Sequence, residues 1–353
     1  MLDAFHGGSH AYVTSLVARF LPGETRVETL PSHLFKWRMG VAALHFAETI
    51  EREGLQPDLL ITTDMMDLSR LKGLCPRALA ASTCVLIMHE NQLSYPTRKA
   101  DRDELHLGLT NLYSAWCADL IWWNSQHHYD LFIERARTLV KLFPKRVPKD
   151  LIERIQVRSH VFGLPMNLQE LASYRPAPAR PRPQGPLRLA WNHRMSFDKN
   201  PERVFERLLR AAKSGLDFEL HLFGPRHEAP PAALAELGLR AIDHGFLERS
   251  DYLRQLAACD VILADPDQEH FGLSVAEGVQ LGLWPLLPKR LCYPEFVPKE
   301  LWADCLFRDE TGFDRLLAKC ADEPQRRVQG FYTDFEASLV IDRLLSVIGS
   351  ESK

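Results

Sequence analysis

Two glutamates, Glu269 and Glu277, stand eight residues apart around the segment Phe271-Gly272-Leu273-Ser274. An apolar run at 261–264 predicts a buried strand before them, so Glu269 should lie in a loop and Glu277 about two turns inside the next helix. The free N–H groups and the dipole at a helix start favour a diphosphate. One carboxylate would then hold sugar hydroxyls and the other a ribose diol, and we assign the intervening residues to the same donor site. The alternative is a surface helix, because an E-x7-E spacing alone is common.

A basic group follows the predicted strand at 187–192. Asn192, His193 and Arg194 come first, and Lys199 stands five residues after Arg194. The carboxyl edge of a doubly wound sheet is where ligands bind. Two cations there would neutralise a leaving diphosphate without a metal ion. We therefore assign these four residues to donor binding, and Arg194 and Lys199 to catalysis together with Glu269. A solvated basic turn is the alternative.

Polar residues also follow predicted strands in the first half of the chain. Gly7 and Gly8 come after a short opening strand and would let the backbone approach the donor, while Ser9 would cap the next helix. The strand at 84–88 is followed by His89, which we assign to a donor hydroxyl and to catalysis. Turns with capping roles are the alternative. The residues assigned to the acceptor are Ser9, His10, Glu90, Asn91, Gln92 and Asn124.

The elements that must position these residues form two βα series. Continuous apolar runs at 58–63, 84–88 and 120–124 alternate with periodic segments, and this pattern is typical of a parallel sheet covered by helices on both faces. Five prolines within 174–186 predict an extended linker. A second βα series follows it. We expect an α/β protein with an N-terminal domain at 1–173, a C-terminal domain at 187–325, a cleft between them, and a helical tail at 326–353 that packs back on the first domain.

Composition limits the classes of partner. Of 353 residues, 46% are hydrophobic and 25% charged, and the formal net charge is -3, so the whole chain has no bulk attraction to nucleic acid or anionic membrane. Seven scattered cysteines indicate buried reduced thiols, and with no apolar run of membrane-spanning length they favour the cytoplasm. The basic clusters at 98–102 and 141–149 are typical of solvated surface and gain meaning only if the acceptor is a nucleic acid.

Metal ligation is not expected. Asp265-Pro266-Asp267 has the spacing of a DxD metal motif, but we interpret it as part of the loop before Glu269. Arg194 and Lys199 already supply the positive charge that a divalent ion would bring to a diphosphate.

Taken together, these residues resemble the pattern of family 4 glycosyltransferases, which combine a GG loop, R-x4-K and E-x7-E. The chain is similar in particular to the tRNA-queuosine alpha-mannosyltransferases, although the third residue of their His-Arg-Trp is Met195 here. The pieces that carry the resemblance are Gly7-Gly8-Ser9-His10, Lys36-Trp37-Arg38, His89-Glu90-Asn91-Gln92-Leu93-Ser94-Tyr95-Pro96, Asn124-Ser125, Asn192-His193-Arg194, Asp198-Lys199-Asn200-Pro201, Glu269-His270-Phe271-Gly272, Glu277, and Pro288-Lys289-Arg290-Leu291-Cys292-Tyr293-Pro294-Glu295.

The resemblance implies a GT-B fold and the retaining transfer of mannose from GDP-mannose to queuosine in a tRNA anticodon. It assigns Arg194 and Lys199 to the diphosphate, Glu277 to the ribose, Glu269 to the donor sugar and His89 to the sugar near the reacting centre. Neither the base nor the sugar of the donor follows from the residues themselves. Two other functions stay open: a GT-B enzyme that acts on a glycan, lipid or small molecule, and a non-catalytic nucleotide- or RNA-binding protein.

Overall fold

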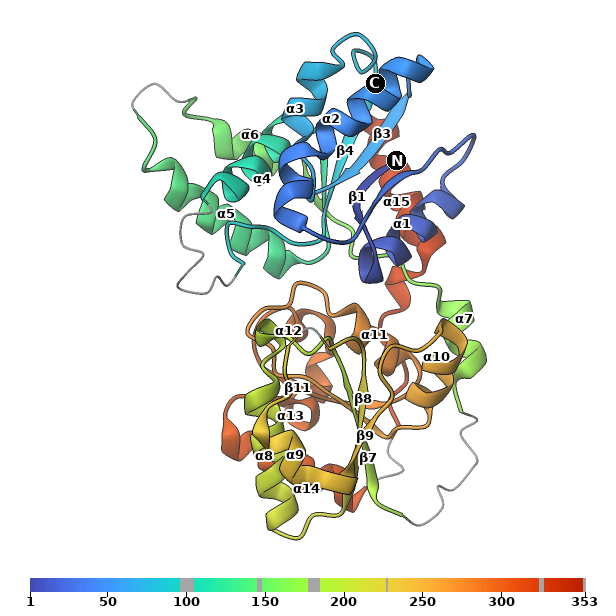
Figure 1. The fold of residues 1–353 in the computed structure, drawn as a ribbon, viewed down its shortest axis with the longest axis vertical. Helices are drawn as coiled ribbons and strands as arrows, with labels where there is room; N and C mark the ends of the chain where they lie inside the picture. Colours follow the sequence, from blue (N-terminus) through green and yellow to red (C-terminus); the bar gives the residue numbers. More distant parts are fainter. Residues whose placement is uncertain (96–104, 145–147, 177–184, 227, 324–326, 352–353) are drawn as a thin grey trace. The chain divides into compact units, whose positions relative to one another are not determined.

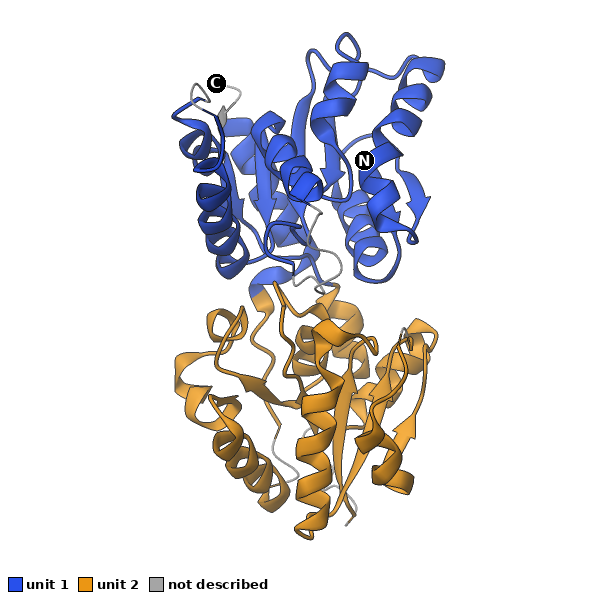
Figure 2. Cartoon of the chain, turned by 60° about the vertical axis from the view of Figure 1, so that its left-hand side comes forward, with its two compact units in different colours: residues 1–166, 334–353 blue, residues 167–333 orange. Residues whose placement is uncertain are grey.

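The computed structural model describes residues 1–95, 105–144, 148–176, 185–226, 228–323 and 327–351. The chain forms two compact units (Figure 2). Unit 1 comprises Met1–Met166 and Asp334–Lys353, and unit 2 comprises Asn167–Thr333. Each unit contains a six-stranded parallel sheet. The predicted α/β class with two Rossmann-like sheets is therefore confirmed.

The sheet of unit 1 has the strand order β2-β1-β3-β4-β5-β6. Its inner strands are the apolar runs of the sequence, and they are buried because helices cover both faces of the sheet (Figure 1). The strands are β1 (Leu2–His6), β2 (Glu28–Pro31), β3 (Leu59–Thr63), β4 (Thr83–Met88), β5 (Leu120–Trp123) and β6 (Ser159–Val161). The helices are α1 (Gly8–Phe20), α2 (Phe35–Glu53), α3 (Leu68–Leu74), α4 (Leu105–Cys117), α5 (Gln126–Val140), α6 (Leu151–Val157) and α15 (Ala337–Glu351).

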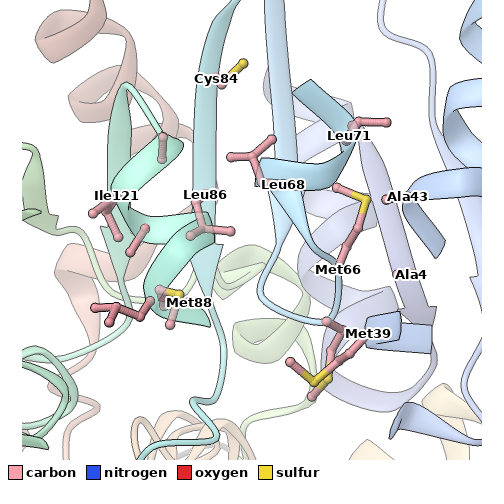
Figure 3. Close-up of a cluster of buried hydrophobic side chains, with 14 of the residues drawn as sticks. Ala4, Met39, Ala43, Met66, Leu68, Leu71, Cys84, Leu86, Met88 and Ile121 are labelled. Carbon is pink, nitrogen blue, oxygen red and sulfur yellow. The ribbon is translucent and has the colours of Figure 1, made fainter. Parts of the chain in front are cut away.

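The core of unit 1 lies between one face of this sheet and helices α2 to α6. Figure 3 shows part of it, where Leu86 and Met88 of β4 lie between Ile121 of β5 and Leu68 at the start of α3. All four side chains have no exposed surface. Close packing of this kind fixes the carboxyl ends of β3, β4 and β5, from which the polar loops leave.

The sheet of unit 2 has the order β12-β11-β10-β7-β8-β9. Successive strands are added to one side of β7 up to β9 and to its other side from β10 on, so the strand order reverses between β7 and β10. The strands are β7 (Leu187–Asn192), β8 (Phe218–Phe223), β9 (Ala241–Asp243), β10 (Val261–Leu263), β11 (Trp284–Pro288) and β12 (Leu306–Phe307). The helices are α7 (Leu168–Tyr174), α8 (Pro201–Lys213), α9 (Ala232–Leu237), α10 (Arg249–Ala257), α11 (Leu273–Gln280), α12 (Tyr293–Phe296), α13 (Trp302–Cys305) and α14 (Glu310–Asp322). The point of reversal is where ligands bind in such sheets.

The units divide at Met166, seven residues before the expected end of the first domain at 173. Helix α7 contacts α10 and α11 and so belongs to unit 2. The tail helix is α15, which contacts α1 of unit 1. The expected helical tail at 326–353 was too long, since regular helix begins only at Ala337. Residues 177–184 of the expected linker lie outside the described residues.

The expected helix cap at Ser9 is wrong. Helix α1 begins at Gly8, so Ser9 lies inside its first turn, where it cannot act as an N-cap. Helix α11 begins at Leu273, and Glu277 is therefore its fifth residue, just over one turn inside rather than two. Sequence patterns locate helices well but place their ends within only a residue or two.

The cysteines are as expected: all seven are free thiols, and six of them are buried. Burial raises the pKa of Cys84 to about 11, which keeps this thiol protonated. Within the described ranges, no helix is both long and apolar enough to cross a membrane.

Candidate active site

The four charged residues predicted from spacing lie in unit 2, and two of them meet directly. Lys199 ends the single helical turn Phe197–Lys199, and its Nζ lies 3.1 Å from Oε2 of Glu269. Their side chains keep only 15% and 16% of their surface exposed. The two residues are 70 positions apart in sequence, and the sheet brings them together because they follow the adjacent strands β7 and β10.

Arg194 belongs to the same group through Asp198. Its Nη2 donates to Oδ2 of Asp198 at 2.9 Å, and Lys199 Nζ lies 3.6 Å from the same oxygen. Ser196 donates to the other oxygen of Asp198 at 2.6 Å. Asp198 is nearly fully buried, and its contacts hold the side chains of Arg194 and Lys199 in place. Arg194 keeps 37% of its side chain exposed, so its guanidinium retains access to a ligand.

Burial and neighbouring charges together set the protonation states of Lys199, Glu269 and His193. Burial works to lower the pKa of Lys199, but the carboxylates of Glu269 and Asp198 outweigh it and raise that pKa above the usual lysine value. Burial likewise works to raise the pKa of Glu269, and Lys199 reverses the shift, so the pKa of Glu269 is lowered. Burial, with the nearby Lys199 charge, lowers the pKa of His193 to about 3, so this imidazole is neutral. The site therefore holds a stable ion pair next to an uncharged histidine.

The start of α11 lies beside this ion pair. Gly272 adopts a left-handed conformation with φ 76° and precedes the first helical residue, Leu273. A Cβ atom at Gly272 would lie 3.3 Å from Tyr293 and 3.5 Å from Cγ of Glu269, so both the conformation and the space favour glycine. Phe271 is buried and anchors the turn. The first N–H groups of the helix, including that of Ser274, have no partner within the helix, which suits an anion.

Glu277 is not a free carboxylate. Its Oε2 accepts a hydrogen bond from Tyr252 at 2.7 Å, and its Oε1 accepts from Arg249 at 2.5 Å. Tyr252 in turn accepts from the side-chain amide of Asn192 at 2.5 Å, and Arg249 pairs with Glu170 at 3.0 Å. Glu277 is thus held rigidly at the carboxyl edge of β7, and its role towards a ribose stays a prediction.

The polar residues predicted in unit 1 follow the carboxyl ends of β1, β4 and β5. The rings of His10 and His89 lie 4.2 Å apart between centroids, and both are buried. Burial, and then the proximity of His10, lowers the pKa of His89 well below the usual value, so that imidazole is neutral as well. Glu90 and Gln92 are half-buried, and they remain predicted acceptor contacts.

The two asparagines assigned to the acceptor are engaged inside unit 1. Asn91 is fully buried and accepts hydrogen bonds from the amide and hydroxyl groups of Ser94, both at 2.9 Å. Asn124 donates to the carbonyl oxygen of His89 at 2.9 Å, and its own amide oxygen lies 2.8 Å from Nδ1 of His128. These hydrogen bonds hold the loop after β4 in place.

Of the paired glycines, Gly7 packs against Ser32, directly after β2, and Gly8 faces open space. A Cβ at Gly7 would lie 2.1 Å from the Ser32 hydroxyl, so only glycine fits this close approach. Gly8 has φ 52°, another conformation that favours glycine. Ser9 is exposed on the first turn of α1.

Sequence reasoning missed residues that support the site. Asp198, Arg249 and Tyr252 orient the charged residues of unit 2, as described above. In unit 1, Asp64 accepts from the backbone N–H of His89 at 2.9 Å, and Asn111 accepts from that of Gln92 at 2.7 Å. Burial, and then the charge of Glu90, raises the pKa of Asp64 well above the usual value. The signal for Asp64 was its place directly after a buried strand, the same signal that selected His89.

Over the part of the chain that the structure describes, no group of three or more His, Cys, Asp or Glu side chains is arranged to hold a metal ion. The DxD aspartates bind arginines instead. Asp265 pairs with Arg203, Arg207 and Arg290, and Asp267 pairs with Arg203.

Sequence comparison relates the chain to one family of mannosyltransferases. Residues 1–166 match the model of the N-terminal domain of tRNA-queuosine alpha-mannosyltransferases. The chain is 29% identical over 309 residues to the tRNA-queuosine alpha-mannosyltransferase of Drosophila melanogaster, covering 85% of this chain and 81% of that protein.

Among solved structures, Anabaena HepE in complex with UDP and glucose has a TM-score of 0.66 at 16% identity and covers 99% of both chains. Sucrose-phosphate synthase from Thermosynechococcus elongatus has a TM-score of 0.67 at 14% identity, covering 99% of this chain and 98% of that one. These likenesses show the fold. The chain is therefore similar over most of its length to the tRNA-queuosine alpha-mannosyltransferases, and it is a glycosyltransferase of the GT-B fold, as its motifs predict.

Proposed function

We propose that this chain transfers mannose from GDP-mannose to queuosine in a tRNA anticodon, with retention of configuration. The observation that carries the proposal is the buried contact between Lys199 and Glu269 beside the start of α11. It brings together, at one helix terminus, a cation for a diphosphate and a carboxylate for a sugar. The name of the Drosophila relative supports mannose and the tRNA acceptor.

In the proposed mechanism the donor diphosphate lies against the first N–H groups of α11. Arg194 and Lys199 neutralise its charge as the bond from the anomeric carbon to the phosphate oxygen breaks. The acceptor hydroxyl attacks the same face of the sugar, and the leaving phosphate oxygen takes its proton. Glu269 holds sugar hydroxyls, and Glu277 holds the ribose diol. No enzyme nucleophile is needed, in contrast to the paired carboxylates of retaining hydrolases.

In this proposal the acceptor is recognised by unit 1. Neutral His89 offers a hydrogen bond to the sugar near the reacting centre, and the half-buried Glu90 and Gln92 bind the cyclopentenediol. A neutral imidazole suits this position because it can accept or donate without adding charge near the departing diphosphate. The charge needed for catalysis then comes from residues alone, without a metal ion.

The test is to incubate the protein with GDP-mannose and queuosine-containing tRNA, digest the tRNA and measure the mass of the queuosine nucleoside. We expect a gain of one hexose, which tRNA without queuosine does not show. UDP-glucose in place of GDP-mannose tests the donor. An unchanged nucleoside mass with continued donor hydrolysis would contradict the tRNA acceptor and favour a glycan, lipid or small-molecule acceptor.

A further inference from the structure

A second basic site lies in unit 2, away from the residues assigned to the donor. It is a hollow of about 370 Å³ lined by Arg203, Arg207, Lys289, Arg290, Arg308 and Asp265, with Pro288 and Phe307 at its base. None of these residues belongs to the predicted diphosphate or sugar contacts. The lining carries five cations and one carboxylate, a formal excess of four positive charges.

Three elements bring the cations together. Arg203 and Arg207 stand four residues apart, on one face of α8. Lys289 and Arg290 directly follow β11, and Arg308 directly follows the neighbouring edge strand β12. The hollow therefore lies at the carboxyl edge of the sheet, where parallel strands leave room for a ligand.

Asp265 holds the arginines in a fixed arrangement. Its Oδ2 lies 2.7 Å from both Arg203 and Arg207, and its Oδ1 lies 2.6 Å from Arg290. Asp265 is 2% exposed and each of its oxygens is already engaged. One carboxylate thus orients three guanidinium groups but can neutralise only one of them, which leaves an ordered, positively charged surface.

Neighbouring acids offset only part of this excess. Asp267 pairs with Arg203 and offsets one charge, while Asp309 caps the start of α14 and Glu310 pairs with Arg210. Lys289 lies over the ring of Trp302, 4.1 Å from its centre, and Arg308 is exposed. Burial lowers the pKa of Arg207, as expected for a cation whose charge is incompletely compensated.

We propose that this hollow binds a backbone phosphate of the RNA acceptor, an inference that rests on the function proposed above. Guanidinium groups match phosphate oxygens in paired hydrogen bonds. A small-molecule site would be enclosed and mostly apolar. Here the rim residues Arg203 and Arg290 keep 37% and 39% of their side chains exposed, so a polymer can enter and leave. Only an RNA phosphate uses both the charge and the openness.

The test measures tRNA affinity by fluorescence anisotropy over a series of salt concentrations. The variant Lys289→Gln/Arg308→Gln removes two lining charges and leaves the buried Asp265 network intact. The control Lys213→Gln/Arg240→Gln also removes two charges, one exposed at the far end of α8 and one half-buried beside β9, at the opposite edge of the sheet. Thermal unfolding of each variant checks the fold.

Each phosphate contact contributes about 0.9 to the slope of log affinity against log salt. We expect the lining variant to reduce the magnitude of this slope by about one, because the hollow binds one phosphate, and to weaken binding on the order of tenfold at physiological salt, while the control keeps the wild-type slope. Equal slopes for the two variants would overturn the assignment. A raised KM for the sugar nucleotide with unchanged tRNA affinity would overturn it as well, by assigning the hollow to the donor.

The two proposals fail in different ways. If the wild-type protein neither binds nor modifies queuosine-containing tRNA, the proposed function fails, and the RNA assignment fails with it. If the wild type modifies this tRNA and the lining variant binds it like the control, only the assignment of the hollow is wrong.

Discussion

The two units share a parallel sheet but differ in the chemistry at its carboxyl edge. In unit 2 the edge residues are charged and paired: Lys199 with Glu269, Arg194 with Asp198, and Arg249 with Glu277. In unit 1 the corresponding edge holds the neutral imidazole of His89 and side-chain amides, and the buried carboxyl group of Asp64 has a raised pKa. The strand orders also differ, since the order of strands reverses between β7 and β10 in unit 2 but between β1 and β3 in unit 1.

The difference shows how one architecture serves two kinds of ligand. An ionic edge can bind and stabilise a diphosphate whose negative charge grows during the reaction. A neutral edge can bind hydroxyl groups without competing for that charge. We therefore expect the loss of a charged group to lower turnover or stability far more in unit 2 than in unit 1.

The largest effect is expected for Lys199→Ala. This variant removes the buried cation nearest Glu269, and turnover should fall on the order of 10² or more because charge on the leaving diphosphate loses its stabilisation. Single-turnover kinetics with saturating donor measure this step. Lys213→Ala, at the exposed end of α8, is the control. Turnover near wild type for Lys199→Ala would contradict the charge mechanism.

Two carboxyl-to-amide substitutions, one in each unit, compare how much the carboxyl groups at the two sheet edges contribute to stability. Glu269→Gln removes the nearer of the two carboxylates paired with Lys199 and should cost about 3 kcal/mol of unfolding free energy. Asp64→Asn keeps an oxygen that accepts from the His89 N–H and should cost about 1 kcal/mol, because burial already favours the neutral acid. Denaturant unfolding measures both. Similar losses in the two variants would remove the distinction between an ionic and a neutral edge.

Acid should destabilise the protein through its buried neutral histidines. His193 has a pKa of about 3 when folded against about 6.5 when unfolded, so its stabilising effect is complete above pH 6.5 and is lost as pH falls towards 3. At pH 5.5, His193→Gln should lose about 1.4 kcal/mol less than wild type, each measured relative to its own stability at pH 7.5. Replacing the exposed His45 is the control. Parallel pH profiles for wild type and His193→Gln would contradict the assignment.

The smallest effect is expected for Tyr252→Phe. Loss of the hydrogen bond to Glu277 should weaken donor binding by about 1 kcal/mol, near fivefold in Kd, because Arg249 still holds the carboxylate. Titration of the protein with nucleotide measures the change. A loss comparable to that of Lys199→Ala would mean that Tyr252 itself touches the ligand.

Much of the fold follows from local patterns. The apolar runs that became β3, β4, β5 and β7 were visible because side chains of buried parallel strands are apolar on both faces. The edge strands β2, β6 and β12 were missed, since they are short or only half-buried and their sequences show no continuous run. Helix α7 was placed in the wrong domain because its contacts with α10 and α11 join residues some 80 to 110 positions away.

The sequence by itself determined which residue types follow which strands, and this was enough to select Arg194, Lys199, Glu269 and Glu277. Tertiary structure alone decided their partners. Lys199 meets Glu269 across 70 positions, and Glu277 is held by Arg249 and Tyr252 rather than left free. The physical reason is that strand and helix patterns depend on neighbours in the chain, whereas an ion pair depends on which strands lie side by side in the sheet.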